Sequence, residues 1–326
     1  MTLYLASGGW SPRVNVCAGA RVCHRHGAPQ RSMNRRPAAV IVRKPHPRRC
    51  RGRCRGARGA RYDGVMSDES AFLRLICEQP DDDTVRLVYA DWLEEHGQAA
   101  RASYIRGEVE LANTPPGTDA DERRRAVLFA RRAELLKAHG AQWLEPFIPF
   151  ARKESFARGF VQTVEVPANL FLQHAERWFA LTPLTRVKFT TCRIWDQVSG
   201  AYAWWTEPLF KSPLLSRLER IDMEGLELTA RDLKLLGEHP DLSRLRELFL
   251  ADNEIGSEGA VVLANMPQLR ALESLDVRGN RITDRGARAL AQSEHLGKLK
   301  ELRITKNSIR DRNWAVLEER FGNALS

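Results

Sequence analysis

The chain has 326 residues, 43% of them hydrophobic, with 51 Lys and Arg against 41 Asp and Glu and a formal net charge of +10. This length allows about two domains and this composition allows a sizeable buried core, so disorder along the whole chain is excluded. No run of 18 apolar residues occurs, which excludes a membrane-spanning helix, and the apolar run at residues 3–6 is too short for a secretory signal. We therefore expect no membrane partner.

The excess positive charge lies in residues 1–65. They hold 15 Lys and Arg and one acid, Asp63, whereas residues 66–326 hold 36 basic and 40 acidic residues. Arg, Gly, Ala and Pro fill 35 of these 65 positions without apolar periodicity, so we expect a basic, disordered leader. The favoured interpretation is that the leader comes from a mis-assigned start and that Met66 is the true first residue.

Three other interpretations of the leader stay open. As a polycationic arm it would contact phosphates, and a nucleic-acid partner is expected only if this leader is real. As an Arg-rich, nearly acid-free stretch it is also compatible with an organellar address. Its Cys and His residues supply zinc-binding atoms at poor spacing, namely Cys17, Cys23, His24, His26, Cys50 and Cys54.

Only Cys77 and Cys192 lie outside the leader. Two thiols that are far apart in sequence suggest a reducing compartment, and we expect a cytoplasmic protein.

Residues 66–150 are expected to form a small all-α domain. A first helix begins after Ser67 and ends before Pro80, and a second begins at a cap, Asp81, and ends at His96-Gly97. The second helix has an apolar face at helical spacing, formed by Val85, Val88, Tyr89, Trp92 and Leu93. A third helix carries Ala102, Ile105, Val109 and Ala112, and a fourth, capped by Thr118 or Asp119, carries Val127, Leu128, Leu135 and Leu136.

The most distinctive stretch of this region is RLVYADWLEEHG at residues 86–97, with Phe72-Leu73 and Pro80-Asp81-Asp82-Asp83 before it and RASYIR at 101–106 after it. Over about 50 residues it resembles the repeat-companion domain found in many planctomycete proteins. That domain has no established activity. The resemblance implies that leucine-rich repeats follow.

A repeat with a step of 27 residues follows. Leu245, Leu248, Leu250, Asn253 and Ile255 recur as Leu272, Leu275, Val277, Asn280 and Ile282, and again as Leu299, Leu302, Ile304, Asn307 and Ile309. Degenerate copies precede them, beginning at Val161, Leu184 and Leu218, so about six strands are expected. We expect each copy to be a strand and a helix joined by a turn in which the Asn side chain bonds the backbone of the neighbouring turn.

The helices of the repeats align as well, with small residues at Gly259-Ala260 and Gly286-Ala287 and with Ser257 and Thr283 as expected caps. The pattern resembles leucine-rich repeats of the ribonuclease-inhibitor type. The expected fold is therefore α/β: a short leucine-rich-repeat solenoid over residues 160–322, preceded by the all-α domain. Trp314, at the position of the small Ala in the last copy, is expected in an end cap.

The strand residues that alternate with the leucines should face the concave side of such a solenoid. In the first strands they include Thr163, Glu165, Pro167, Arg186, Lys188 and Thr190. The candidate partner-binding residues are Arg220, Asp222, Glu247, Phe249, Asp276, Arg278, Glu301 and Arg303. Charges of both signs favour a protein partner, since a phosphate-binding surface would be uniformly basic. We expect Phe249 to be exposed and to form the energetic centre with Arg278 and Arg303.

The seven extra residues of the copy that begins at Leu184 must form a longer loop or helix, with aromatic residues at Tyr202, Trp204 and Trp205. We expect these rings to cover the core, the alternative being a binding tip.

No catalytic residue, metal site or cofactor is expected. The acids at 81–83, 91, 94 and 95 fit a helix start and a solvated surface, and neither His174, His239 nor Cys192 lies in a nucleophile motif. Phosphate-loop, G-x-S-x-G and H-E-x-x-H motifs do not occur. We expect a non-enzymatic module that binds an unidentified protein. The alternative, implied by the repeat type, is a regulator of a GTPase, which a GTPase turnover assay would distinguish.

Overall fold

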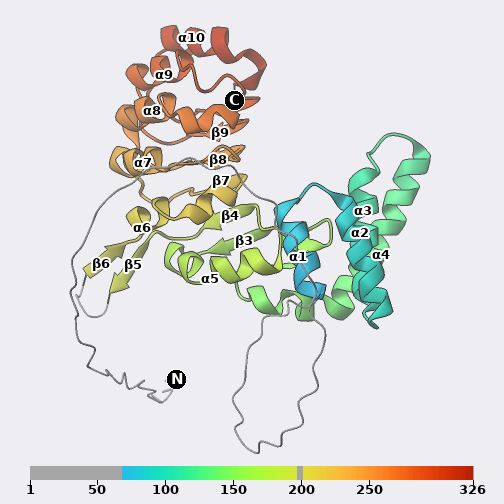
Figure 1. The fold of residues 1–326 in the computed structure, drawn as a ribbon. Coiled ribbons are helices and arrows are strands. Elements are labelled where there is room, and N and C mark those ends of the chain that lie inside the picture. Colours follow the sequence, from blue (N-terminus) through green and yellow to red (C-terminus); the bar gives the residue numbers. More distant parts are fainter. Residues whose placement is uncertain (1–67, 197–200, 326) are drawn as a thin grey trace, which may run out of the picture. The chain divides into compact units, whose positions relative to one another are not determined.

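The computed structural model describes residues 68–196 and 201–325, with Trp195 and Asp196 described by their backbone alone. The expectations for the leader, including its disorder, its zinc ligands and a start at Met66, lie outside these residues, as does the expected cap Ser67. The described residues belong to one compact unit, in which a group of helices precedes an array of alternating strands and helices (Figure 1).

The α-helices, in chain order, are α1 (Asp68–Glu78), α2 (Asp83–Glu95), α3 (Ala99–Asn113), α4 (Asp119–Leu144), α5 (Ala168–Leu181), α6 (Thr206–Phe210), α7 (Ala230–Gly237), α8 (Gly256–Ala264), α9 (Asp284–Ala291) and α10 (Asp311–Phe321). Short 3-10 turns lie at Glu145–Phe147, Lys153–Ser155, Pro213–Arg217, Pro267–Ala271 and Gly322–Ala324. The strands are β1 (Phe156–Ala157), β2 (Phe160–Val161), β3 (Thr163–Val166), β4 (Arg186–Phe189), β5 (Arg193–Asp196), β6 (Ala201–Trp204), β7 (Arg220–Asp222), β8 (Glu247–Phe249), β9 (Ser274–Asp276) and β10 (Glu301–Arg303).

The six predicted repeat strands form one parallel sheet in the order β10-β9-β8-β7-β4-β3, which confirms the predicted α/β class. Strands β7–β10 pair in the register of the 27-residue step, so that Ile221, Leu248, Leu275 and Leu302 stand side by side. Equivalent residues of successive repeats therefore form straight rows across the sheet.

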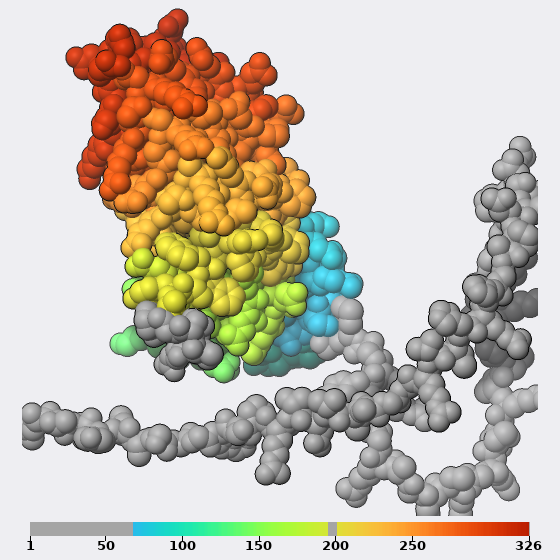
Figure 2. Space-filling view, turned by 90° about the vertical axis from the view of Figure 1, so that its left-hand side faces the viewer, coloured from blue at the N-terminus to red at the C-terminus, as the bar shows by residue number. Residues whose placement is uncertain are grey.

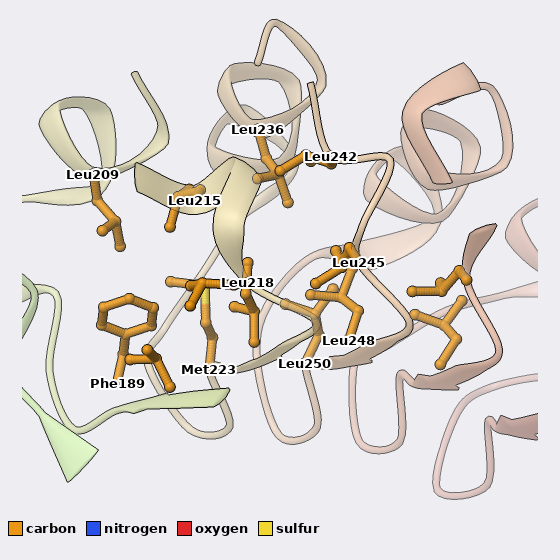
Figure 3. Packing of buried hydrophobic residues seen from close by; sticks show 14 of the residues in the cluster. Phe189, Leu209, Leu215, Leu218, Met223, Leu236, Leu242, Leu245, Leu248 and Leu250 are labelled. Atoms are coloured by element: carbon orange, nitrogen blue, oxygen red, sulfur yellow. The ribbon is translucent and has the colours of Figure 1, made fainter. Parts of the chain in front are cut away.

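The repeat leucines point from the strands toward the helices and form the core between them (Figure 3). Leu245, Leu248 and Leu250 of one repeat are fully buried, and Leu236 of α7 belongs to the same core on the helix side. Alternate residues of a strand face opposite sides, so this inward set fixes which side chains face away from the helices. Seen from the helix side, the repeats from α7 to α10 present a continuous packed surface (Figure 2).

The repeat helices pack closely because small residues lie between them. A Cβ placed on Gly286 of α9 would stand 2.9 Å from Cβ of Ala260 in α8 and 2.7 Å from Cγ2 of Ile282. The expected cap Ser257 instead lies inside α8, where its hydroxyl contacts that of Thr283 at 2.6 Å and accepts the Thr283 N–H.

The buried face of α2 is rotated from the predicted one. It consists of Arg86, Tyr89, Ala90 and Leu93, while Val88 is 49% exposed. The buried Arg86 guanidinium donates to the carbonyls of Pro80 and Asp82, at 2.6 and 3.1 Å. These bonds compensate for the burial of the charge. The cation of Arg86 therefore lies on the buried face of α2, where the apolar pattern predicted Val88. The N-cap is Asp82, whose carboxylate accepts the Thr84 N–H, and not Asp81.

The first half of α4 extends beyond the core. Its N-cap is Thr118, in a capping box with Asp121. Val127, predicted as core, is exposed, as is Ala112 of α3, because this part of α4 packs only along one side on α3. Farther along α4, Leu135, Leu136 and Leu144 join the repeat core.

The β1–β2 hairpin joins the helices to the repeats. Phe160 packs in the cluster of α1, α2 and α3, and the next residue, Val161, packs in the repeat core. Between the strands, Gly159 has φ +86° and lies so close to α3 that an added Cβ would stand 2.8 Å from Cγ1 of Ile105. The predicted boundary between residues 150 and 160 falls beside this hairpin.

The extra residues of the second repeat form an antiparallel ribbon of β5 and β6. Trp205, which follows it, packs on the repeat core, but Tyr202 and Trp204 are 53% and 46% exposed. The expectation that these two rings cover the core is therefore wrong. The ribbon stands away from the core, and alternate side chains of its β6 strand face solvent.

Both edges of the parallel sheet are partly covered. Leu325 pairs with Leu302 along β10. At the other edge, the Glu165 N–H of β3 donates to the carbonyl of Phe150 at 2.8 Å. Among the described helices, none combines the length and apolar composition that a membrane crossing needs.

Candidate protein-binding face

The face of β7–β10 that points away from the helices, here called the open face, carries the candidate partner-binding residues. The strand register brings Arg220, Glu247, Ser274 and Glu301 into one row. All eight candidates line one shallow cavity of about 450 Å³. Its full lining is Arg220, Asp222, Glu224, Glu247, Phe249, Glu273, Ser274, Asp276, Arg278, Lys300, Glu301 and Arg303.

The side chains of this row bind one another across the strands. Arg220 donates to Glu247 at 3.0 Å, and its guanidinium also lies 3.7 Å from the Asp222 carboxylate. Ser274 donates its hydroxyl to Glu301 at 3.0 Å, and Glu301 also pairs with Arg303 at 2.6 Å. The Arg303 bond lowers the pKa of Glu301. These contacts hold long side chains in fixed positions.

Asp276 is the centre of this network. Its carboxylate is almost fully buried and accepts a two-pronged bond from Arg278, at 2.9 to 3.0 Å from Nε and 2.6 Å from Nη2. Arg303 approaches the same carboxylate at 3.8 Å. The bond to Asp276 raises the pKa of Arg278. Paired geometry of this kind orients both partners.

Phe249 is not the exposed ring that was expected. Only 9% of it is accessible, because the guanidinium of Arg220 lies 4.2 Å from the ring centre and that of Arg303 lies 5.9 Å away. The guanidinium of Arg278 instead donates to the Asp276 carboxylate. An approaching molecule therefore meets the arginines above Phe249 before it meets the ring.

The open face is mixed in charge but not neutral. Six carboxylates and four basic side chains line the cavity, which gives a formal charge of −2. Its arginines already have carboxylate partners, so a phosphate chain would find few free cations and several negative groups. This arrangement suits the mixed polar surface of a protein better than nucleic acid.

A second cavity, of about 550 Å³, lies at the β3 end of the sheet. Its floor holds the predicted outward residues Thr163, Glu165, Pro167 and Thr190. Its wall was not predicted and consists of Pro149, Phe150, Arg152, Glu154 and Ser155. This segment has no repeat periodicity, and the bond between Glu165 and Phe150 places it beside β3.

The repeat asparagines link successive turns. Oδ1 of Asn253 accepts the N–H groups of Leu226 and Leu228, both at 2.9 Å, and its Nδ2 donates to the Met223 carbonyl. Asn307 repeats the pattern 54 positions later, accepting from Asn280 and Ile282 and donating to Val277. Asn280 accepts from Ile255 at 3.4 Å and donates to Leu250. All three side chains bond backbone groups of the neighbouring repeat.

The remaining polar candidates have structural partners. Nε2 of the buried His239 lies 3.1 Å from the Ser212 carbonyl, and its Nδ1 accepts the Asp241 N–H. Cys192 is buried, and burial raises its pKa to about 12. Arg106 binds Asp91 and Glu94, and Arg158 binds Asp83. Within residues 68–196 and 201–325, no three His, Cys, Asp or Glu side chains gather as metal ligands would.

Comparison with known proteins concerns the repeats. Residues 243–264 and 268–291 match a family model described as leucine-rich repeat. No curated protein matches the chain. Among solved structures, leiomodin-1 actin-binding site 2 is 20% identical over 29% of this chain and 57% of that chain, with a TM-score of 0.25. An internalin from Listeria monocytogenes is 16% identical over 43% of this chain and 47% of that chain, with a TM-score of 0.21.

The chain thus spans about half the length of these two solved proteins. The match at residues 243–264 and 268–291 covers β8, α8, β9 and α9, and these residues are similar to leucine-rich repeats.

Proposed function

We propose that the chain is a non-enzymatic interaction module whose repeats form a short solenoid over residues 160–322 and bind a protein on the open face. The observation that carries this proposal is the network of Arg–carboxylate pairs around Phe249 on the open face. Side chains held before binding lose less conformational entropy when a partner arrives. Arg and aromatic residues also contribute strongly to binding at protein interfaces.

We further propose that residues 66–150 are the repeat-companion domain, of the type found in planctomycete proteins, and that the protein is cytoplasmic. The buried positions of Tyr89, Ala90, Leu93 and Ile105 in the distinctive stretches support a role for that domain in packing.

The test is affinity capture from extract of the native cell, with bound proteins quantified by mass spectrometry. The full chain is compared with Phe249→Ala and Arg278→Glu. A partner of the open face should be captured about tenfold less by either variant, which corresponds to about 1.4 kcal/mol of binding free energy. If that partner is a GTPase, its turnover with and without the chain separates binding from regulation.

Arg285→Glu is the matched control, because Arg285 is exposed on α9, on the helix side. It should leave capture unchanged. Capture that is lost with Arg285→Glu and kept by the other two variants would assign binding to the helices and refute the proposal.

A further inference from the structure

The β5–β6 ribbon carries a second, separate surface. Arg193 of β5 is paired with Trp204 of β6 in the strand register. Its guanidinium lies 4.6 Å from the ring centre of Tyr202 and 5.5 Å from that of Trp204. Both rings nonetheless keep about half of their surface exposed. The ribbon lies on the helix side of the repeats, the side that faces the viewer in Figure 2, and so away from the open face.

Trp204 also forms a wall of a groove of about 300 Å³ at the end of the ribbon. Thr206 and Glu207 of α6 and the start of α7 complete it, and Leu235 gives it an aliphatic patch. The charged residues of the lining are Glu207, Glu227, Arg231 and Asp232. Three carboxylates and one guanidinium give a formal charge of −2 beside an aromatic wall.

Each of these three carboxylates makes its described contacts through only one of its two oxygens. Glu207 binds Lys211 through Oε1, and Glu227 binds Arg193 through Oε2, both at 2.6 Å. Asp232 accepts from Thr229 through Oδ2. A carboxylate accepts hydrogen bonds at both oxygens. The described contacts thus leave Oε2 of Glu207, Oε1 of Glu227 and Oδ1 of Asp232 available to a further donor.

We propose that this groove binds an arginine or lysine side chain from a basic segment of a protein partner. The aliphatic stem packs on Trp204 and Leu235, and the cationic head donates to the second oxygens of Glu207 and Glu227. Long basic side chains combine an apolar stem with a charged head, and aromatic faces attract cations. An acidic segment would be repelled by the negative lining.

The proposal is tested on the full chain by fluorescence anisotropy with a labelled octapeptide of alternating Arg and Gly. An octapeptide of alternating Glu and Gly is the charge control. The basic peptide should bind and the acidic one should not. Trp204→Ala and Glu207→Gln should each weaken binding by about tenfold, while Trp204→Tyr, which keeps an aromatic wall, should recover most of it.

Two matched variants exclude nonspecific attraction. Phe129→Ala removes an exposed ring from α4, and Glu318→Gln removes an exposed charge from α10. Both should change affinity by less than about twofold. Equal binding of the two peptides, unchanged binding by Trp204→Ala, or equal weakening by Glu318→Gln would each overturn the proposal. So would a dimer in sedimentation that Trp204→Ala abolishes, because the occupant would then be a second copy of the chain.

Discussion

Individual side chains replace backbone pairing where each repeat turns from strand to helix. Asn253 makes two bonds to N–H groups of the preceding repeat and donates to the carbonyls of Met223, Leu250 and Ala251. The residue itself is buried. Backbone groups left unpaired in a buried turn cost free energy, so this one amide fixes the spacing of two repeats.

Asn253→Ala should therefore lower the free energy of unfolding by about 3 kcal/mol, since several buried groups lose their partner and each costs about 1–3 kcal/mol. Urea denaturation measures this change. Asn265→Ala is the control, because Asn265 is exposed and its side-chain amide donates to the Val261 carbonyl in the adjoining helix α8. Equal losses for the two variants would contradict the structural role assigned to Asn253.

Asp284 is a second residue whose side chain bonds the backbone of a neighbouring repeat, and its contribution to the stability of the fold depends on pH. The N–H of Arg310 donates to its carboxylate, and the guanidinium of Arg310 also binds it, which lowers its pKa from 3.8 to about 2. A lowered pKa in the folded state stabilises the fold above the unfolded pKa, and this stabilisation is lost as pH falls from about 4 to 2. Asp284→Asn should lower the melting temperature at pH 7.

The pH series supplies the control for this prediction. The difference in melting temperature between Asp284→Asn and the unchanged chain should shrink as pH falls from 4 toward 2. A difference that stays constant over this interval would show that the carboxylate charge does not stabilise the fold.

Among the elements, the β1–β2 hairpin is notable because it contributes residues to both apolar clusters. Its neighbouring residues Phe160 and Val161 enter two different apolar clusters. Phe160 also lies near two cations, with the guanidinium of Arg86 5.8 Å and that of Arg101 5.4 Å from its ring centre. Burial lowers the pKa of Arg101 to about 10. The hairpin thus couples the helices to the first repeat.

Gly159→Ala should destabilise the chain by about 3 kcal/mol or more, because the new Cβ would overlap Ile105 and the backbone has a positive φ. Gly225→Ala separates the two effects. Gly225 has φ +69° but no atom within 4 Å of an added Cβ, so its substitution should cost only about 1 kcal/mol. Thermal melts of both variants give the comparison, and similar losses would contradict a close approach at Gly159.

Elements that repeat were predictable, and elements that occur once were less so. The 27-residue step predicted the strands and the row of Ile221, Leu248, Leu275 and Leu302, because each copy packs against a copy with the same apolar pattern. The ribbon at Tyr202 and Trp204 has no second copy for alignment, and its aromatic residues resemble core residues in sequence. The cover over Phe249 comes from arginines on two other strands, β7 and β10, which no local pattern encodes.

Over the whole described unit, the apolar core forms two clusters whose contacts are between neighbouring elements. One cluster runs from Tyr104 of α3 through the repeats to Leu317 of α10, and a smaller one joins α1, α2 and α3 to Phe160. In arrays of this kind each repeat contacts mainly the adjacent ones, so stability is close to a sum of local and interface terms. Damage at one end should therefore remain near that end.

Leu302→Ala, in the last strand, should cost about 2–5 kcal/mol and increase hydrogen exchange in β9, β10 and α10 while sparing α1–α3. Ile105→Ala, an equally buried site in α3, should do the reverse. Exchange measured by mass spectrometry distinguishes the two. A uniform increase along the chain with either variant would mean that the unit opens as a whole.

The pairing of Leu325 with Leu302 has a consequence for self-association. An uncovered edge strand can pair with a strand of another molecule, and the same pairing can then continue from one molecule to the next. By pairing with Leu302, Leu325 covers part of β10 and leaves less of this edge open to such addition. A fusion that pulls residues 322–325 away from β10 should expose this edge strand and promote self-association of the chain into fibres.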